Sequence, residues 1–153
     1  MQPFRFRAAA ALEHRRRQEE AAEATLVRAE AGFTASREVL ATATARHVAA
    51  MTAQDGAVRA GTGGHTLLWH RNWITSLAAG IDVARREMNR HETAVAEARQ
   101  AWFAARKKRL MLERLRDRAL ARHRLAEQRW ELKQIDELAR MRFMLATAER
   151  SIE

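Results

Sequence analysis

A long stretch without helix-breaking residues places the strongest limit on how this chain can fold. From about Thr66 to about Thr147 there is no proline, and there is no glycine after Gly80. Alanine, arginine, leucine, glutamate and glutamine fill most of the stretch, and these residues have high helix propensity. One helix of this length would reach on the order of 120 Å. Because a compact domain of 153 residues is much shorter, the sequence predicts a rod, with the rest of the chain packed along this helix.

The first third of the chain carries a coiled-coil pattern. Large and small residues recur at steps of three and four, which places them on one face of a helix from about Phe4 to about Thr52. This face consists of Leu12, Arg15, Glu19, Ala22, Leu26, Ala29, Phe33, Ser36, Leu40, Ala43, His47 and Ala50. Its small residues would let a partner helix come close. Gly32 lies within this helix, where a glycine costs about 1 kcal/mol relative to alanine.

A glycine-rich segment follows at 53–65 and separates the two helical patterns. It holds four of the six glycines and has no apolar periodicity, so we expect a flexible connector. It lacks the residue order of a phosphate-binding loop, and no strand precedes it.

The long helix, expected over about 66–147, begins near Thr66, a residue type that suits an N-cap. Its first half carries a second face with coiled-coil spacing, made of Ile74, Leu77, Ile81, Ala84, Met88, His91, Val95, Ala98, Trp102 and Ala105. Two helices joined by a short connector pack antiparallel. We therefore predict an all-α fold in a single domain over 1–153: an antiparallel two-helix coiled-coil hairpin with a longer second helix.

The second half of the long helix is expected to extend past the end of the first helix. Beyond about Leu115 the apolar repeat moves to Leu125, Leu132 and Ala139. This leaves roughly 30 residues without an intramolecular partner, which must rely on helix propensity and on ion pairs such as Glu113 with Arg116. Residues 148–153 are expected to fray.

Positive charge is concentrated on that second half. The net charge of the chain is +9, and residues 105–142 hold 13 Lys/Arg against 6 Asp/Glu. This excess indicates an acidic partner, which can be a protein, a nucleic acid or a membrane surface. Acidic residues interleave with the basic ones, which disfavours a face that tracks phosphates. No apolar stretch of about 20 residues occurs, so no membrane span is expected.

No residue pattern supports catalysis, cofactor binding or a metal site. His91 and Glu92 begin like a zinc-protease signature, but Val95 stands where the second histidine is needed. His65 and His70 lack a third ligand nearby in the sequence. The chain has no cysteine, which excludes disulfides and thiolate metal sites and is compatible with a reducing compartment. We therefore expect a protein that is not an enzyme. We also expect Trp130, on the extended part of the long helix, to be an exposed residue that anchors a partner.

Three segments in order carry a family resemblance. They are FRFRAAAALEHRRRQEEAAEATLVRAE at the start, WITSLAAGI early in the long helix, and KKRLMLERLRDR followed by EQRWELKQIDELARMRF towards the end. Each alone is a weak coiled-coil pattern, but their order and spacing resemble those of the bacterial flagellar FliJ family. The resemblance covers nearly the whole chain apart from the glycine-rich connector.

This resemblance implies a cytoplasmic, stalk-like coiled coil of the flagellar type III export apparatus, peripherally associated with the inner membrane at the flagellar base. It implies three partners: the export ATPase hexamer, the cytoplasmic domain of the membrane export gate, and export chaperones. The implied gate-binding residues are Ser36, Leu40, Ala43, His47, Trp73, Leu77, Gly80 and Ala84. The implied residues towards the ATPase ring are Phe4, Arg5, Arg7, Arg118, Arg122, Trp130 and Leu138.

Three other functions stay open at this point. The stalk protein of an injectisome-type secretion system has the same shape, although the FRFR start favours the flagellar branch. A basic coiled coil that binds nucleic acid would show affinity that falls steeply with salt. A structural homo-oligomer would pair the extended ends of its second helices.

Overall fold

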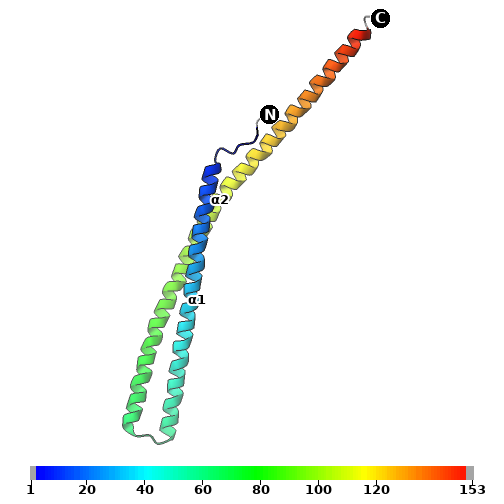
Figure 1. Ribbon diagram of the computed structural model, residues 1–153. Helices are drawn as coiled ribbons and strands as arrows, with labels where there is room; N and C mark the ends of the chain where they lie inside the picture. The colour runs from blue at the N-terminus through cyan, green and yellow to red at the C-terminus, as the bar shows by residue number, and fades with distance from the viewer. Residues whose placement is uncertain (1–2, 151–153) are drawn as a thin grey trace. The chain divides into compact units, whose positions relative to one another are not determined.

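Two α-helices make up almost all of the described chain. The computed structural model describes residues 3–150, with side chains described as far as Met144. Helix α1 spans Ala9–Arg59 and helix α2 spans Gly64–Arg150 (Figure 1). No strand occurs among the residues so described. The predicted all-α fold with a longer second helix is confirmed.

The chain divides into two compact units. The hairpin unit is Arg17–Ala105, and the terminal unit combines Met1–Arg16 with Arg106–Glu153. Each unit contains part of both helices. The prediction of a single domain over 1–153 stays a prediction.

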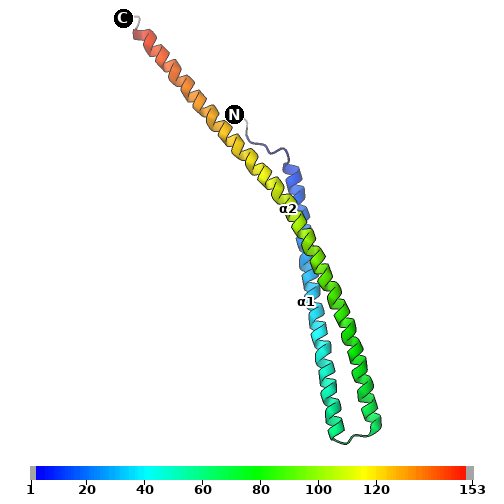
Figure 2. The ribbon, with the colours of Figure 1, turned by 180° about the vertical axis from the view of Figure 1, so that it is seen from behind.

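In the hairpin unit, α1 and α2 run antiparallel and side by side, as two opposite views agree (Figures 1 and 2). The predicted faces are confirmed there, because every predicted contact position on both helices is buried or half-buried. We call these positions the seam. Within the hairpin unit, its most buried members are Ser36, Ala50, Ala84 and Ala98. Since these side chains are small, the seam is thin and buries little apolar area per residue.

Helix α1 extends further than predicted, so the predicted connector over 53–65 is wrong in length. The loop covers only 60–63. Gln54 and Ala57 continue the seam and are half-buried, so packing stabilises the helix past Gly56. The helix stops at Gly61, whose φ of 68° is positive. There Thr62 N–H donates to the carbonyl of Ala57 at 3.1 Å and Gly61 N–H to that of Val58 at 3.1 Å, the two bonds of a Schellman cap.

The first helix begins later than predicted, at Ala9 rather than near Phe4. Phe4 and Phe6 are half-buried while Arg5 and Arg7 are exposed, so side chains alternate in and out. This period of two is that of extended backbone. The ring of Phe4 meets the ring of His123 edge-on, with centroids 5.6 Å apart. In both views the segment before α1 lies beside α2 (Figures 1 and 2).

Helix α2 begins at Gly64, two residues before the predicted Thr66. The carbonyl of Gly63 accepts from Thr66 N–H at 3.0 Å and from Leu67 N–H at 3.3 Å, so Gly63 starts the first turn. At the other end, α2 continues past Thr147 to Arg150. Of the stretch expected to fray, residues 148–150 are helical, and 151–153 lie outside the described residues.

In the terminal unit, the half-buried face of α2 continues the seven-residue register of the seam and does not shift to Leu125 and Leu132. It follows Arg109, Leu112, Arg116, Ala119 and His123. Leu125, Leu132 and Ala139 are exposed, so the predicted change of register was wrong. A seven-residue register set by packing continues as long as a partner segment lies alongside, even over polar residues.

The exposed part of α2 starts later than Leu115. Glu127 is still half-buried, whereas every described side chain from Gln128 to Met144 is exposed. The reason is the segment before α1, which lies along α2 and brings Phe4 to His123. Over the described residues, no helix is both long enough and apolar enough to cross a membrane.

Candidate partner-docking surfaces

The two sides of the hairpin unit differ in chemistry. On one side lie the residues that immediately follow a seam position, such as Glu30 and Arg99, which form an ion pair at 3.2 Å. On the other side lie the residues that immediately precede a seam position. In an antiparallel pair, the preceding residues of one helix lie beside the preceding residues of the other. We call these the following side and the preceding side.

The preceding side carries an apolar groove of about 560 Å³. It is lined by Gly32, Ala35, Ser36, Val39, Gly80, Val83, Ala84, Glu87 and His91. Most of these residues are small or apolar, and Val39 and Val83 are more than half exposed. We call this hollow the glycine groove. A coiled coil commonly places charged residues beside its seam, so an apolar groove there marks a surface that another molecule can cover.

Gly32 and Gly80 shape the groove in different ways. A Cβ placed on Gly32 would lie 3.0 Å from His91 Nδ1, so the absence of a side chain lets the imidazole approach α1. A Cβ on Gly80 would meet nothing within 4 Å. Gly80 therefore keeps the groove open without accommodating a neighbour from the other helix.

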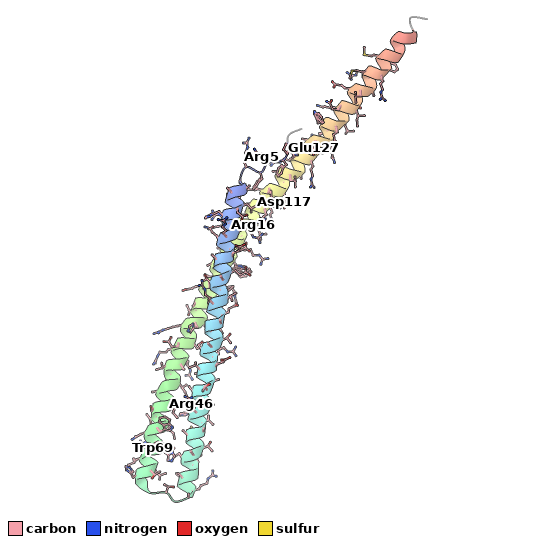
Figure 3. All side chains as sticks on the ribbon, in the orientation of Figure 1. Arg5, Arg16, Arg46, Trp69, Asp117 and Glu127 are labelled. Atoms are coloured by element: carbon pink, nitrogen blue, oxygen red, sulfur yellow. The ribbon has the colours of Figure 1, made fainter. Side chains whose placement is uncertain are left out.

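A stacked pair of tryptophans stands on the preceding side near the loop. The rings of Trp69 and Trp73 are nearly parallel, with an interplanar angle of 10° and centroids 6.2 Å apart. The ring of His70 meets that of Trp69 edge-on at 5.2 Å. Trp69 lies on α2 close to the turn between the helices (Figure 3). Exposed tryptophan is typical of residues that dominate binding energy.

The eight predicted gate-binding residues all lie in the hairpin unit but not on one outer surface. Leu40, Ala43, His47 and Leu77 are half-buried on the seam. Ser36 and Ala84 are the most deeply placed, and they form the floor of the glycine groove together with exposed Gly80. Trp73 is exposed in the tryptophan pair. The structure thus brings Ser36, Gly80 and Ala84 together and leaves the other five outside the groove.

Sequence reasoning missed six groove residues. They are Gly32, Ala35, Val39, Val83, Glu87 and His91. A signal for five of them was present, because each stands one residue before a predicted seam position: Gly32, Ala35, Val39, Val83 and Glu87. Small or β-branched residues at those positions on both helices indicate an apolar side.

In the terminal unit, a carboxylate between two arginines ties the start of α1 to α2. Glu113 of α2 accepts from Arg16 of α1 at 3.2 Å and from Arg109, one turn away, at 2.5 Å. The predicted partner, Arg116, instead pairs with Asp117. Figure 3 shows Arg16 on the α1 part of this unit. We call Arg16, Arg109 and Glu113 the Glu113 clamp.

The clamp shifts the titration of its carboxylate. Burial by itself raises the pKa of Glu113, but hydrogen bonds from Arg16 and Arg109 and the charges of both lower it by more. The net pKa of Glu113 therefore lies below its ordinary value. The side chain of Glu113 is 20% exposed, so solvent still weakens these interactions.

The predicted ATPase-facing residues all belong to the terminal unit. Phe4 is half-buried against His123, while Arg5 and Arg7 are exposed. Arg118, Arg122, Trp130 and Leu138 are exposed on α2. A shallow hollow of about 360 Å³ is lined by Arg122, Leu125, Ala126, Arg129, Trp130 and Lys133. Three of these residues are cations, so the hollow suits an acidic partner.

The described side chains form two open surfaces. Among the described residues, no three histidine, aspartate or glutamate side chains lie close enough together to hold a metal ion. Both hollows lie open on the sides of helices. The arrangement can bind partners along two faces, one apolar and one basic.

Comparison with known proteins agrees with a helical export component. A family model described as "Flagellar FliJ protein" matches residues 9–148. No curated protein and no solved structure gives a significant match. The matched range contains the glycine groove, the tryptophan pair, the Glu113 clamp and the exposed part of α2 as far as its last side chain described.

Proposed function

The chain belongs to the flagellar FliJ protein family, and from this membership we propose that it is a non-enzymatic stalk of the flagellar type III export apparatus. Membership implies a component of the flagellar export apparatus. The finer role has two contacts. The terminal unit docks in the ring of the export ATPase, and the hairpin unit meets the cytoplasmic domain of the membrane export gate. The match over residues 9–148 carries this proposal, because it includes the glycine groove and the exposed part of α2.

Charge and exposure support the contact with the ATPase ring. Residues 105–142 hold most of the net positive charge, and every described side chain from Gln128 to Met144 is exposed. An isolated helix with Trp130 and Leu138 exposed leaves apolar surface in water. Docking in a ring with an acidic or amphipathic lining would cover that surface. The stalk then promotes assembly of the hexamer and raises its turnover without hydrolysing nucleotide itself.

Shape supports the contact with the gate. The glycine groove is apolar, open and free of long side chains along most of its length. Three predicted gate-binding residues, Ser36, Gly80 and Ala84, lie in it. We place the gate contact on the preceding side, with the groove as its centre and Trp73 at its edge. The seam residues Leu40, Ala43, His47 and Leu77 support this surface from beneath.

The proposed role also implies a location in the cell and contact with export chaperones. A stalk between the ATPase and the gate would be cytoplasmic and held at the inner membrane of the flagellar base by its partners. Export chaperones would meet it there. Nucleic acid is not among the proposed partners, because acidic residues interleave with the basic ones on late α2.

The central experiment measures the cognate export ATPase with and without this protein. We expect added protein to raise both ATP turnover and the hexamer fraction. Leu138→Ser should remove most of this effect. Val27→Ser is the matched control, since Val27 is 59% exposed and Leu138 57%, but Val27 lies in the hairpin unit. If neither the native protein nor Val27→Ser raised ATP turnover or the hexamer fraction, the proposed ring contact would be wrong.

A genetic experiment separates the flagellar branch from the injectisome branch. Deletion of the chain in its host should abolish motility and leave virulence secretion intact. Loss of virulence secretion with normal motility would assign the chain to an injectisome instead.

A further inference from the structure

The loop end of the hairpin unit exposes large apolar side chains around its circumference. We call residues 46–73 the hairpin tip. Its exposed apolar residues are Val48, Met51 and Val58 on α1, and Leu68, Trp69 and Trp73 on α2. Each of these side chains is about half exposed or more. The tip therefore presents a band of apolar surface where the chain turns.

This band lies on both sides of the hairpin. Val48, Met51 and Val58 each follow a seam position, so they lie on the following side, and Leu68 joins them there. Trp73 precedes the seam residue Ile74, and Trp69 precedes half-buried His70, which continues the seam one heptad before Leu77, so both tryptophans lie on the preceding side. A partner that docks in the glycine groove covers only the preceding side and leaves the following side of the tip in water. Apolar residues on both sides suit a medium that surrounds the tip.

The net charge of the tip is positive, which favours contact with an anionic surface. Between Glu38 and Asp82 the only carboxylate is Asp55, against Arg46, Arg59 and Arg71. Each arginine near an anionic bilayer is attracted to it. Tryptophan has an apolar ring and a polar N–H, which suits the boundary between headgroups and acyl chains.

We propose that the hairpin tip inserts into the interfacial layer of an anionic phospholipid bilayer. Trp69 and Trp73 enter the headgroup boundary as a stacked pair, with Val48, Met51, Val58 and Leu68 beside them. Arg46, Arg59 and Arg71 contact lipid phosphates. The tip lies in the interface and does not span the bilayer. This contact goes beyond the proposed gate contact, because it needs no protein in the membrane.

The test uses the absence of cysteine from the chain. Single cysteines at Leu68→Cys, Val27→Cys and Leu132→Cys are each labelled with an environment-sensitive fluorophore. The full-length proteins are mixed with protein-free vesicles of phosphatidylglycerol and phosphatidylcholine that carry a lipid-attached quencher. We expect a blue shift and quenching at position 68 and neither at position 27. Vesicles of phosphatidylcholine alone should give a much weaker signal.

Position 132 separates the tip from the other cationic region. Late α2 is also basic and is attracted to anionic vesicles. Quenching at position 132 without quenching at position 68 would overturn the proposal, because the membrane contact would then belong to the terminal unit. Absence of binding to any protein-free vesicle would overturn it as well. Neither result affects the ATPase and gate contacts, which are measured without lipid.

A second measurement uses substitution instead of labels. The double variant Trp69→Ser, Trp73→Ser should weaken partitioning to anionic vesicles on the order of tenfold. Phe103→Ser is the matched control, because Phe103 is an aromatic residue of the hairpin unit that is 56% exposed, against 59% for Trp69. Circular dichroism checks that all variants remain helical. Equal partitioning of the double variant and the control would contradict insertion through the tryptophan pair.

Discussion

The imidazole of His91 lies directly over the backbone of Gly32, so closely that a Cβ at Gly32 would be 3.0 Å from Nδ1 and 3.2 Å from Cε1. This contact gives a structural role to a glycine inside a long helix. Gly32→Ala gains helix propensity of about 1 kcal/mol but crowds the ring. We expect the gain to appear in full only when His91 is also replaced. In the His91→Ala background, Gly32→Ala should stabilise more than in the native background, by at least about 0.5 kcal/mol.

Gly56 supplies the control for this double-mutant cycle. It is helical, and a Cβ there meets nothing within 4 Å. Gly56→Ala should therefore stabilise by about 0.5–1 kcal/mol in both backgrounds. Urea unfolding followed by circular dichroism measures all the variants. Equal effects of Gly32→Ala with and without His91 would mean that the ring moves aside at no cost.

Gly61 should tolerate a side chain least among the loop glycines. Its φ is 68°, a conformation that costs a non-glycine residue about 1–2 kcal/mol. Gly61→Ala should therefore lower the free energy of unfolding by about 1 kcal/mol. Gly63→Ala is the control, since Gly63 has no positive φ and no neighbour within 4 Å of an added Cβ. A loss as large for Gly63→Ala would point to loop flexibility instead of the Schellman cap.

The Glu113 clamp should make stability depend on acid. The pKa of Glu113 is lowered in the folded protein, so its contribution is complete above the unfolded value of about 4.3. The contribution is lost as pH falls through the lower folded value. Glu113→Gln should destabilise by about 1 kcal/mol at neutral pH, since the pair is partly screened. The variant should also lose less stability than the native protein on acidification.

Thermal unfolding at several pH values measures this effect. Asp117→Asn is the control, because Asp117 pairs with Arg116 but its side chain is 62% exposed. It should change stability by less than about 0.5 kcal/mol. If the stability of Glu113→Gln and that of the native protein fell in parallel with pH, protonation of Glu113 would not contribute to acid sensitivity.

Charge in the glycine groove should disrupt the proposed gate contact without unfolding the hairpin. Val83 lines the groove and is exposed, so Val83→Arg places a long cation on an apolar surface without entering the seam. We expect affinity for the gate's cytoplasmic domain to fall at least about tenfold. Val27→Arg is the control, because Val27 lies outside the glycine groove. Calorimetric titration measures binding, and equal affinity of both variants would remove the groove from the gate contact.

Local patterns in the sequence were enough to define the seam and the fold class. Leu26, Phe33 and Leu40 recur every seven residues, and Ile74, Ile81 and Met88 do the same on the second helix. Such periodicity fixes which face is buried before any partner is known, because side chains three and four apart share one face. The small residues also predicted that a partner helix could come close, and Ala50, Ala84 and Ala98 are indeed buried between the helices.

The ends of the elements and the partner of each side chain were decided by tertiary packing. Gly56 was predicted to lie in the connector, but it is helical because Gln54 and Ala57 beside it pack in the seam. Phe4 was predicted to begin the first helix, but it lies in an extended segment before α1, where its ring contacts His123. Glu113 lies within reach of several arginines in sequence, and only the approach of α1 brings Arg16 to it. Helix periodicity is a local property of the chain. The glycine groove exists only where preceding positions of two antiparallel helices meet, and the register of that meeting comes from packing along the whole seam.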